Sequence, residues 1–290
     1  MKNQLILALA ALSLFSCGRF DNKEQKGDGE ERIVCVSKQY NEIIYALGAQ
    51  KNLVAVDISS VYPEEIKKLP TVGYHRALSL EGMLSAKPTL IMHSGMKSMG
   101  PEHIVKQLID LKIPMKEFST QSKDIESTKA LMREMGKYFH QEKRADSLCT
   151  ILDADMKVAL DSTKLYTDKP KVLIIHYGRA NNVYLIITQK GPAGKMIEWA
   201  GGEMAMKDTL GMKQMSAEIV TQSNPDVILL TDFGYDQLGS MEKIKELPGV
   251  GSTNAARNNR IFRIEEHDLV YMGPRTGKTT LALQKLIHQN

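Results

Sequence analysis

The chain contains very little cysteine and tryptophan. Its 290 residues include only 3 cysteines and 1 tryptophan, and so few thiols exclude a small fold held together by disulfides. Cys17 stands at the end of an N-terminal leader, Cys35 in an apolar, strand-like run and Cys149 in a helical stretch. Cys35 and Cys149 therefore read as small buried hydrophobic residues, and no disulfide is expected between them.

Long apolar runs, basic tracts and catalytic groupings are missing as well. Beyond the first residues, no stretch is apolar for long enough to cross a bilayer. The formal net charge of +4 comes without a run of basic residues, so nucleic acid is not a predicted partner. No nucleophile beside a base and no pair of carboxylates stands out, and we predict that the protein is not an enzyme.

The first 17 residues have the pattern of a targeting segment. A positively charged start is followed by an apolar run over residues 5–15, which is too short to span a bilayer, and then by Leu14-Phe15-Ser16-Cys17. This ending resembles a bacterial lipobox, whose cysteine is lipidated. We therefore predict a lipoprotein signal peptide at 1–17 and a polar, flexible tether at 18–32. Acyl chains on Cys17 would anchor the protein to a membrane, in the periplasm or on the cell surface.

From Ile33 onward, short apolar runs alternate with segments of helical periodicity. The alternation stops near residue 120 and resumes after Pro170. Each half is therefore predicted to hold a mostly parallel sheet covered by helices. Strands are expected at residues 33–36, 53–57, 89–92, 172–176, 183–187 and 226–231.

Residues 121–168 interrupt this alternation. Apolar residues recur there at near-helical spacing, with Gly136 as the only glycine and with no proline. The pattern predicts one long helix, or two helices end to end. This segment would join an N-terminal lobe at 33–120 to a C-terminal lobe at 169–290. The predicted fold class is α/β, with two Rossmann-like lobes joined by one long α-helix.

The two halves also share an internal repeat. One constant offset relates three residues of the first half to three of the second, namely Ser79, Glu81 and Pro88 to Ser216, Glu218 and Pro225. In each half the proline opens an apolar strand. The lobes are therefore predicted to be related, with the two glutamates at equivalent positions.

The stretch from Thr71 to Gly82 concentrates unusual chemistry, because Tyr74, His75 and Arg76 follow one another directly after a glycine. Ferric iron prefers an oxyanion, and tyrosinate is a known ligand of haem iron. A nearby guanidinium lowers the pKa of a phenol. In an extended segment Arg76 would lie on the same side as Tyr74, and His75 would point away. The residues alone leave two readings open, an iron ligand or a half-buried aromatic in a turn.

Ligands of open α/β sheets bind at the carboxyl ends of the strands. Those ends carry two candidates in the first half and three in the second, which we expect to face each other across a cleft: Tyr74, His93, His176, Tyr177 and Arg179. His176 is the first choice for a second axial ligand. The alternative is an imidazole that is only hydrogen-bonded to its neighbours.

The two lobes, the connecting helix and the lipobox together resemble the substrate-binding proteins of ABC importers of the rigid-helix class, the class III periplasmic binding proteins. Val72 to Gly82 is similar to the haemin-binding subgroup, in which a tyrosine after a glycine ligates haem iron and an arginine two residues on supports it. The resemblance runs from Ile33 to the C-terminus. Further segments match in order and spacing, at 178–180, 200–202, 224–229, 247–250 and 273–276.

This resemblance implies a monomeric receptor that binds ferric haem in the cleft between the lobes. The receptor would deliver the haem to an ABC permease and its ATPase. Tyr74 would be the iron ligand, and Arg76 would support its phenolate. Arginine suits the two haem propionates, and the candidates are Arg179, Arg257 and Arg275.

The repeated glutamates have two readings. The resemblance implies that Glu81 and Glu218 dock onto the permease, where charge pairs set orientation. The alternative is that each only stabilises the first turn of its helix. In the loop after His93, Met96 and Met99 either pack on a porphyrin face or simply fill the loop.

Two other functions remain open at this stage. The same architecture can carry a ferric siderophore or cobalamin instead of haem. A chelatase-like enzyme that handles metal and porphyrin would share the appearance of two lobes.

Overall fold

The structure, a computed structural model, describes residues 31–179 and 181–289. Both lobes belong to one unit that begins at Glu31. The predicted signal peptide with Cys17, and most of the predicted tether, lie outside the described residues. Among the described helices, none combines the length and the apolar character that a membrane crossing requires.

The first lobe is built on a parallel sheet of four strands in the order β2-β1-β5-β6. Its central strands β1 and β5 are buried on both faces. Strands covered on both sides read as continuous apolar runs, and this is why the sequence located them. The strands are β1 (Ile33–Cys35), β2 (Leu53–Val56), β5 (Leu90–Met92) and β6 (Met115–Lys116).

Short helices cover this sheet. Ser37 caps the first of them by accepting a hydrogen bond from the Tyr40 N–H, and Gly48 ends it in the left-handed conformation, where the sequence predicted a stop. The α-helices are α1 (Lys38–Leu47), α2 (Leu80–Ser85) and α3 (Glu102–Asp110), and the 3₁₀ helices are η1 (Gln50–Asn52), η2 (Glu64–Lys68) and η3 (Met96–Ser98).

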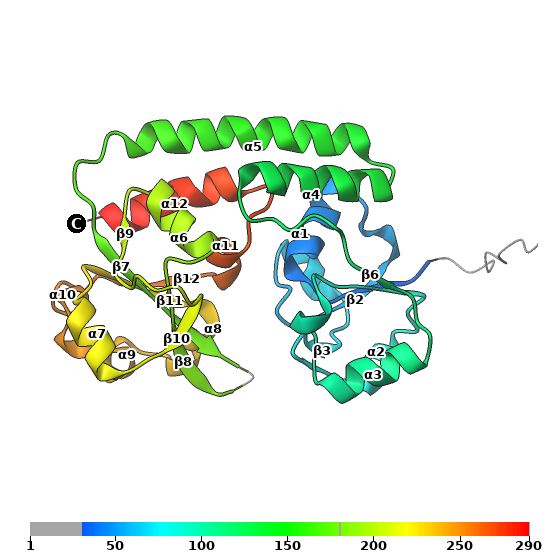
Figure 1. Ribbon diagram of the computed structural model, residues 1–290, viewed down its shortest axis with the longest axis horizontal. Helices are drawn as coiled ribbons and strands as arrows, with labels where there is room; N and C mark the ends of the chain where they lie inside the picture. Colours follow the sequence, from blue (N-terminus) through cyan, green and yellow to red (C-terminus); the bar gives the residue numbers. More distant parts are fainter. Residues whose placement is uncertain (1–30, 180, 290) are drawn as a thin grey trace, which may run out of the picture. The chain divides into compact units, whose positions relative to one another are not determined.

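Two helices, α4 (Ile125–Tyr138) and α5 (Glu142–Thr163), occupy the segment predicted as one long helix or two end to end. They run side by side instead, as Figure 1 shows. The turn between them places His140 at a φ of 55°, which reverses the chain. A Cβ on Gly136 would lie 2.5 Å from the Cβ of Ala145, so this glycine permits the close approach.

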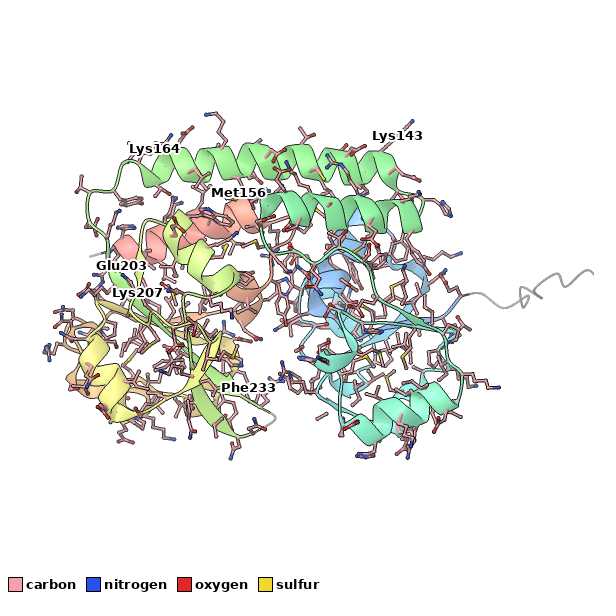
Figure 2. The ribbon with its side chains drawn as sticks, in the orientation of Figure 1. Lys143, Met156, Lys164, Glu203, Lys207 and Phe233 are labelled. Atoms are coloured by element: carbon pink, nitrogen blue, oxygen red, sulfur yellow. The ribbon has the colours of Figure 1, made fainter. Side chains whose placement is uncertain are left out.

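Helix α5 packs against helices of both lobes. It contacts α1 and α4 on one side and α6 and α12 on the other. Figure 2 marks its two ends with Lys143 and Lys164. The connection predicted for 121–168 is therefore made by α5, while α4 packs onto α1 of the first lobe.

The second lobe has a mixed sheet in the order β10-β8-β7-β11-β12, with β9 paired to β7. The pairs β7–β9, β7–β11 and β11–β12 are parallel, whereas β8 pairs in antiparallel register with both β7 and β10. The expectation of a mostly parallel sheet therefore holds better for the first lobe. The strands are β7 (Lys171–Gly178), β8 (Val183–Ile187), β9 (Glu203–Met204), β10 (Met212–Gln214), β11 (Val227–Thr231) and β12 (Ile261–Ile264).

Seven α-helices and a 3₁₀ helix surround the described part of this sheet. They are α6 (Pro192–Trp199), α7 (Ala217–Ser223), α8 (Asp232–Leu238), α9 (Met241–Lys245), η4 (Val250–Ser252), α10 (Asn254–Arg257), α11 (Glu266–Val270) and α12 (Thr276–His288). The last of these, α12, packs along α5. The C-terminal helix thereby ties the connecting helix to the second lobe.

The repeat found in the sequence is a structural repeat. Ser79 and Ser216 are the N-caps of α2 and α7, and each accepts a hydrogen bond from an N–H of the first turn. In both lobes the helix is followed by a proline and a buried central strand, β5 or β11. The two lobes therefore share this unit of capped helix, proline and buried strand.

Each sheet separates two apolar clusters. In the first lobe, alternate residues of β1 and β5 face one cluster under α1, α4 and α5 and another under α2 and α3. Cys35 and Cys149 both lie in the first of these clusters, and both thiols are free and buried. Their prediction as small buried hydrophobic residues is confirmed.

Candidate functional site

Tyr74 lies on a tight hairpin. The strand β3 (Gly73–Tyr74) pairs with β4 (Ala77–Leu78) in antiparallel register, which leaves His75 and Arg76 as the turn. Gly73 has a φ of 94°, and a Cβ there would lie 2.8 Å from the carbonyl oxygen of Ala77. The glycine before the tyrosine is therefore required by the hairpin.

This turn corrects the expectation that the segment is extended. His75 does not point away from Tyr74, since the two rings lie 4.2 Å apart between centroids at an angle of 56°. Arg76 lies in the turn rather than two residues along the same strand face. It still lines a cavity together with Tyr74.

A buried carboxylate holds the hairpin in place. Asp57, directly after β2, accepts hydrogen bonds from the Ser59 N–H (3.2 Å) and the Ser60 hydroxyl (2.6 Å). Its Oδ2 also lies 3.4 Å from Nδ1 of His75. Burial would raise the pKa of Asp57, but the hydrogen bonds from His75, Ser59 and Ser60 outweigh it and lower that pKa. The His75 ring is thus tied to the loop after β2.

Tyr74 lines two cavities, of about 40 Å³ and about 210 Å³, whose walls come from both lobes. The smaller is bounded by the loop after β2, the N-terminus of α1, the end of β7 and the start of α8. The larger is bounded by the β3–β4 turn, by residues of β7, β8 and β10, and by α11 with Tyr271. Four residues line both cavities, namely Tyr74, His176, Arg179 and Glu266.

His176, near the end of β7, lies where the sequence predicted it. Its Nδ1 is 3.2 Å from Oγ1 of Thr231 and 4.0 Å from Oε1 of Glu266. Burial lowers the pKa of this imidazole, and the nearby carboxylate of Glu266 only partly opposes the effect. A neutral imidazole is the form that binds metals.

Tyr177 faces the smaller cavity, but its hydroxyl is already engaged. The side chain is 7% exposed and donates a hydrogen bond to Oδ1 of Asn182. Its ring packs against Tyr184 at 5.0 Å and Phe233 at 5.6 Å between centroids. This geometry makes Tyr177 part of the wall rather than a free ligand.

Arg179 extends over the aromatic rings of the cavity. Its guanidinium carbon lies 3.3 Å from the ring centroid of Phe233 and 6.0 Å from that of Tyr74. Figure 2 shows Phe233 on the part of the second lobe that faces the first. Among the residues that the structure describes, Arg179 has no carboxylate partner.

The pKa of Tyr74 is raised in this setting, first by burial and then by the carboxylate of Glu266. Arg76, Lys38 and Arg179 act in the opposite direction. The predicted influence of Arg76 therefore has the right sign, although burial outweighs it. Without a ligand, the phenol keeps its proton at neutral pH.

Three of the predicted ligand-binding residues, His93, Arg257 and Arg275, line neither of these two cavities. His93 is 2% exposed, and its Nδ1 accepts a hydrogen bond from the Gly95 N–H within the first lobe. The expectation that it faces the cleft is therefore corrected. Arg257 on α10 donates to the Ser252 carbonyl and to Asn254, each at 2.5 Å.

Arg275 lies at the boundary of the lobes but is already paired. It forms ion pairs of 3.0 Å with both Glu42 and Asp268, and it stacks on Tyr62. Its guanidinium is thus used inside the protein. The two methionines of the loop after His93, Met96 and Met99, line a surface groove beside α3 and not the cavities of Tyr74.

Glu81 and Glu218 are both exposed, in the first turns of α2 and α7. Glu218 accepts a hydrogen bond from Nε2 of Gln222 at 3.1 Å, and Glu81 has no side-chain partner within residues 31–179 and 181–289. Both predicted roles, docking and stabilisation of the first helical turn, are compatible with this position.

Sequence reasoning missed several polar residues of the cavities. Asp232 directly follows β11, and Glu266 comes two residues after β12. Lys38 is the first residue of α1, the helix that follows β1 in the chain. Asp57, which holds His75, directly follows β2. The rule that strand ends carry the site was applied to only three strand ends, and its use on every strand would have found these residues.

Two α/β lobes, a connecting helix and polar groups from both lobes around shared cavities define a two-lobe ligand-binding protein. The chain belongs to the Periplasmic binding protein family, whose sequence profile matches residues 33–267. Its fold is that of the class III periplasmic binding proteins, as the sequence predicted.

Known proteins are similar over most of this chain. The periplasmic heme-binding protein RhuT from Roseiflexus sp. RS-1, solved in its apo form, is 31% identical, with a TM-score of 0.79 over 90% of this chain and 98% of RhuT. The ABC transporter substrate-binding lipoprotein YvrC of Bacillus subtilis (strain 168) is 26% identical over 93% of this chain and 91% of its own length. A vitamin B12-binding protein of Pectobacterium atrosepticum is 25% identical over 69% and 71%.

Proposed function

We propose that this protein is the substrate-binding lipoprotein of an ABC importer and that it binds ferric haem between its lobes, with Tyr74 as the iron ligand. One observation carries the proposal. Tyr74 sits on a glycine-dependent hairpin at cavities that it shares with His176 and Arg179 of the other lobe. The similarity to RhuT, 31% identical and named for heme binding, supports the same cargo.

The chemistry of Tyr74 fits a ferric ligand. The porphyrin supplies four nitrogens, so one or two axial protein groups complete the coordination of haem iron. A ferric ion favours the phenolate, and iron must displace the phenol proton because the pKa of Tyr74 is raised by burial and by Glu266. Arg76 and Arg179 stabilise the resulting negative charge. His176 is the candidate for a second axial position.

The pairing of the arginines favours Arg179 for a propionate. Arg275 already binds Glu42 and Asp268, and Arg257 already donates to Asn254 and the Ser252 carbonyl. Arg179 lines both cavities and lacks a carboxylate within the described part of the chain. A planar fork without an internal acceptor is suited to a carboxylate of a ligand.

The volumes of the two cavities require a movement of the protein before haem can bind. At about 40 Å³ and 210 Å³ they are smaller than the roughly 300–1,000 Å³ typical of sites for drug-sized ligands. Haem therefore enters by a small separation of the lobes together with a swing of Arg179 away from Phe233. The exposed ring of Phe233 would then pack against the porphyrin.

Delivery and location complete the proposal. Glu81 and Glu218 are exposed at equivalent helix starts of the two lobes and would dock onto a permease served by an ATPase. The lipobox at Cys17 would anchor a monomeric receptor to a membrane, in the periplasm or on the cell surface. Membership of the family supports an extracytoplasmic binding role without catalysis.

A titration with haemin tests the cargo. The wild-type protein should take up one or two haems and give the high-spin ferric spectrum of a tyrosinate complex, and Tyr74→Phe should abolish that spectrum. Tyr45→Phe is the matched control, because Tyr45 is a half-buried phenol outside both cavities. An unchanged spectrum in Tyr74→Phe would remove Tyr74 from the site.

The similarity to vitamin B12-binding proteins keeps cobalamin as the second candidate. In a competition experiment, excess cobalamin should fail to displace bound haem. Displacement at comparable concentrations would favour cobalamin, and displacement by a ferric siderophore would favour that cargo. Steady turnover of metal and porphyrin would instead indicate a chelatase-like enzyme.

A further inference from the structure

A row of polar contacts joins α1 of the first lobe to the segment that begins with α11 in the second. Lys38 pairs with Glu266, Nε2 of Gln39 donates to the Met272 carbonyl at 2.7 Å, and Glu42 pairs with His267 and Arg275. Of this row, Lys38 and Glu266 line a cavity of Tyr74, and Glu266 alone lines both. Glu266 therefore belongs to the contact between the lobes and to the ligand site.

Glu266 is ionised in this position. Burial would raise the pKa of its carboxyl, but the nearby charge of Lys38 and the imidazole of His176 outweigh burial and hold that pKa below its usual range. Its backbone N–H donates to Asp232 at 3.0 Å, which fixes the start of α11. The cavities of Tyr74 thus contain a held negative charge.

A ferric haem brings further negative charge to the same space. Its two ionised propionates outweigh the single positive charge of the ferric porphyrin core, and Tyr74 adds a phenolate charge when its proton leaves to solvent on coordination. Charges of the same sign within a partly buried site repel each other by an amount comparable to a tenfold change in affinity. Lys38 offsets part of this repulsion because it pairs directly with Glu266.

We propose that Glu266 is a positioning residue that weakens the hold of Tyr74 on its ligand, so that the ligand can be released, and that Lys38 sets the strength of this effect. The inference rests on the proposed function. It assigns to a carboxylate between the lobes a role in how long an anionic porphyrin stays bound.

The rate of haem loss tests this role. Haem-loaded protein is mixed with an excess of a haem-free globin as a trap, and transfer is followed by absorbance. Glu266→Gln keeps the shape and an acceptor for Lys38 but removes the charge, and it should slow haem loss by about tenfold. Glu265→Gln is the matched control, because Glu265 is the preceding residue and lines neither cavity of Tyr74. Its rate should stay within about twofold of wild type.

The dependence on Tyr74 separates this role from a structural one. The slowing by Glu266→Gln should shrink in a Tyr74→Phe background, because the phenolate is then absent. Unchanged or faster haem loss in Glu266→Gln overturns the inference. A Tyr74→Phe protein that keeps the wild-type haem spectrum overturns the proposed function itself, so the two failures are distinguishable.

A second variant tests Lys38, the ion-pair partner of Glu266. Lys38→Met leaves the carboxylate of Glu266 unpaired and should speed haem loss, while Lys38→Met combined with Glu266→Gln should be as slow as Glu266→Gln alone. Circular dichroism checks that each variant is folded. If Lys38→Met alone does not fold, the comparison between the double variant and Glu266→Gln decides, and a double variant with wild-type or faster haem loss contradicts the proposal.

Discussion

Two arginines at the boundary of the lobes invite comparison. Arg179 stacks on Phe233 at 3.3 Å, and Arg275 stacks on Tyr62 at 3.6 Å from the ring centroid. The stacking is alike, but the charges around them are not. Arg275 forms ion pairs with Glu42 and Asp268. Arg179 has no carboxylate partner within residues 31–179 and 181–289.

The difference indicates which part of the boundary is structural and which part is kept for a ligand. Around Arg275, opposite charges are mutually paired, with Glu42 between Arg275 and His267. Around Arg179, a guanidinium, a phenol and an imidazole line common cavities without pairing with one another. Arg179 is only half-buried, and its guanidinium donors are left for an acceptor that the described residues do not supply.

The largest expected effect comes from breaking the ion pairs around Arg275. Glu42→Gln removes the carboxylate that Arg275 and His267 share and should lower the free energy of unfolding by about 3 kcal/mol, measured by urea denaturation. Haem affinity should change by less than about twofold, because Glu42 lines neither cavity of Tyr74. Glu65→Gln, an exposed carboxylate, is the control. A loss of affinity without a loss of stability would reverse the comparison.

A change at Arg179 should instead lower haem affinity and leave the free energy of unfolding nearly unchanged. Arg179→Gln should raise the dissociation constant for haem by about tenfold, since a charge-assisted contact to a propionate is lost. Its unfolding free energy should stay within about 0.5 kcal/mol of wild type. Arg257→Gln, with an arginine already engaged on α10, should leave haem affinity unchanged. Equal losses of affinity in both variants would indicate a general effect of charge.

The smallest expected effect is a change in how the stability of the protein depends on pH. Burial would raise the pKa of Glu42, but His267 and Arg275 lower it in the folded state. A carboxyl with a depressed folded pKa stabilises the protein above the unfolded value of about 4.3, and this stabilisation is lost as the pH falls through the folded pKa. Wild-type stability should therefore fall below about pH 4.3 more steeply than that of Glu42→Gln. Parallel curves between pH 3 and pH 6 would show that Glu42 does not contribute.

Much of the local structure was readable from the sequence. Continuous apolar runs located β1, β5, β7 and β11 because strands buried on both faces need no polar alternation. Gly48 predicted the end of α1, and the repeated serines mark the N-caps of α2 and α7. The glycine before Tyr74 and the repeat drew attention to the residues of this hairpin, since short-range backbone demands leave a direct trace in residue type.

The sequence did not reveal how distant parts pair. Helical spacing at 121–168 could not tell two helices end to end from two side by side, because periodicity gives a face and not a partner. The residues left the turn at His75 and Arg76 open as one of two readings, because pairing of Gly73 with Leu78 depends on backbone contacts rather than on side-chain pattern. Both points concern direction reversals of the chain.

By itself, the sequence determined the two α/β halves, the apolar cores and Tyr74 as the centre of interest. Only the tertiary structure decided which arginine is already paired within the protein. Glu42 and Arg275 lie 233 positions apart in the chain, and their ion pair forms only because α1 and the segment after α11 meet at the boundary of the lobes. Whether a charged side chain is paired depends on neighbours that folding brings close, and no local pattern records them.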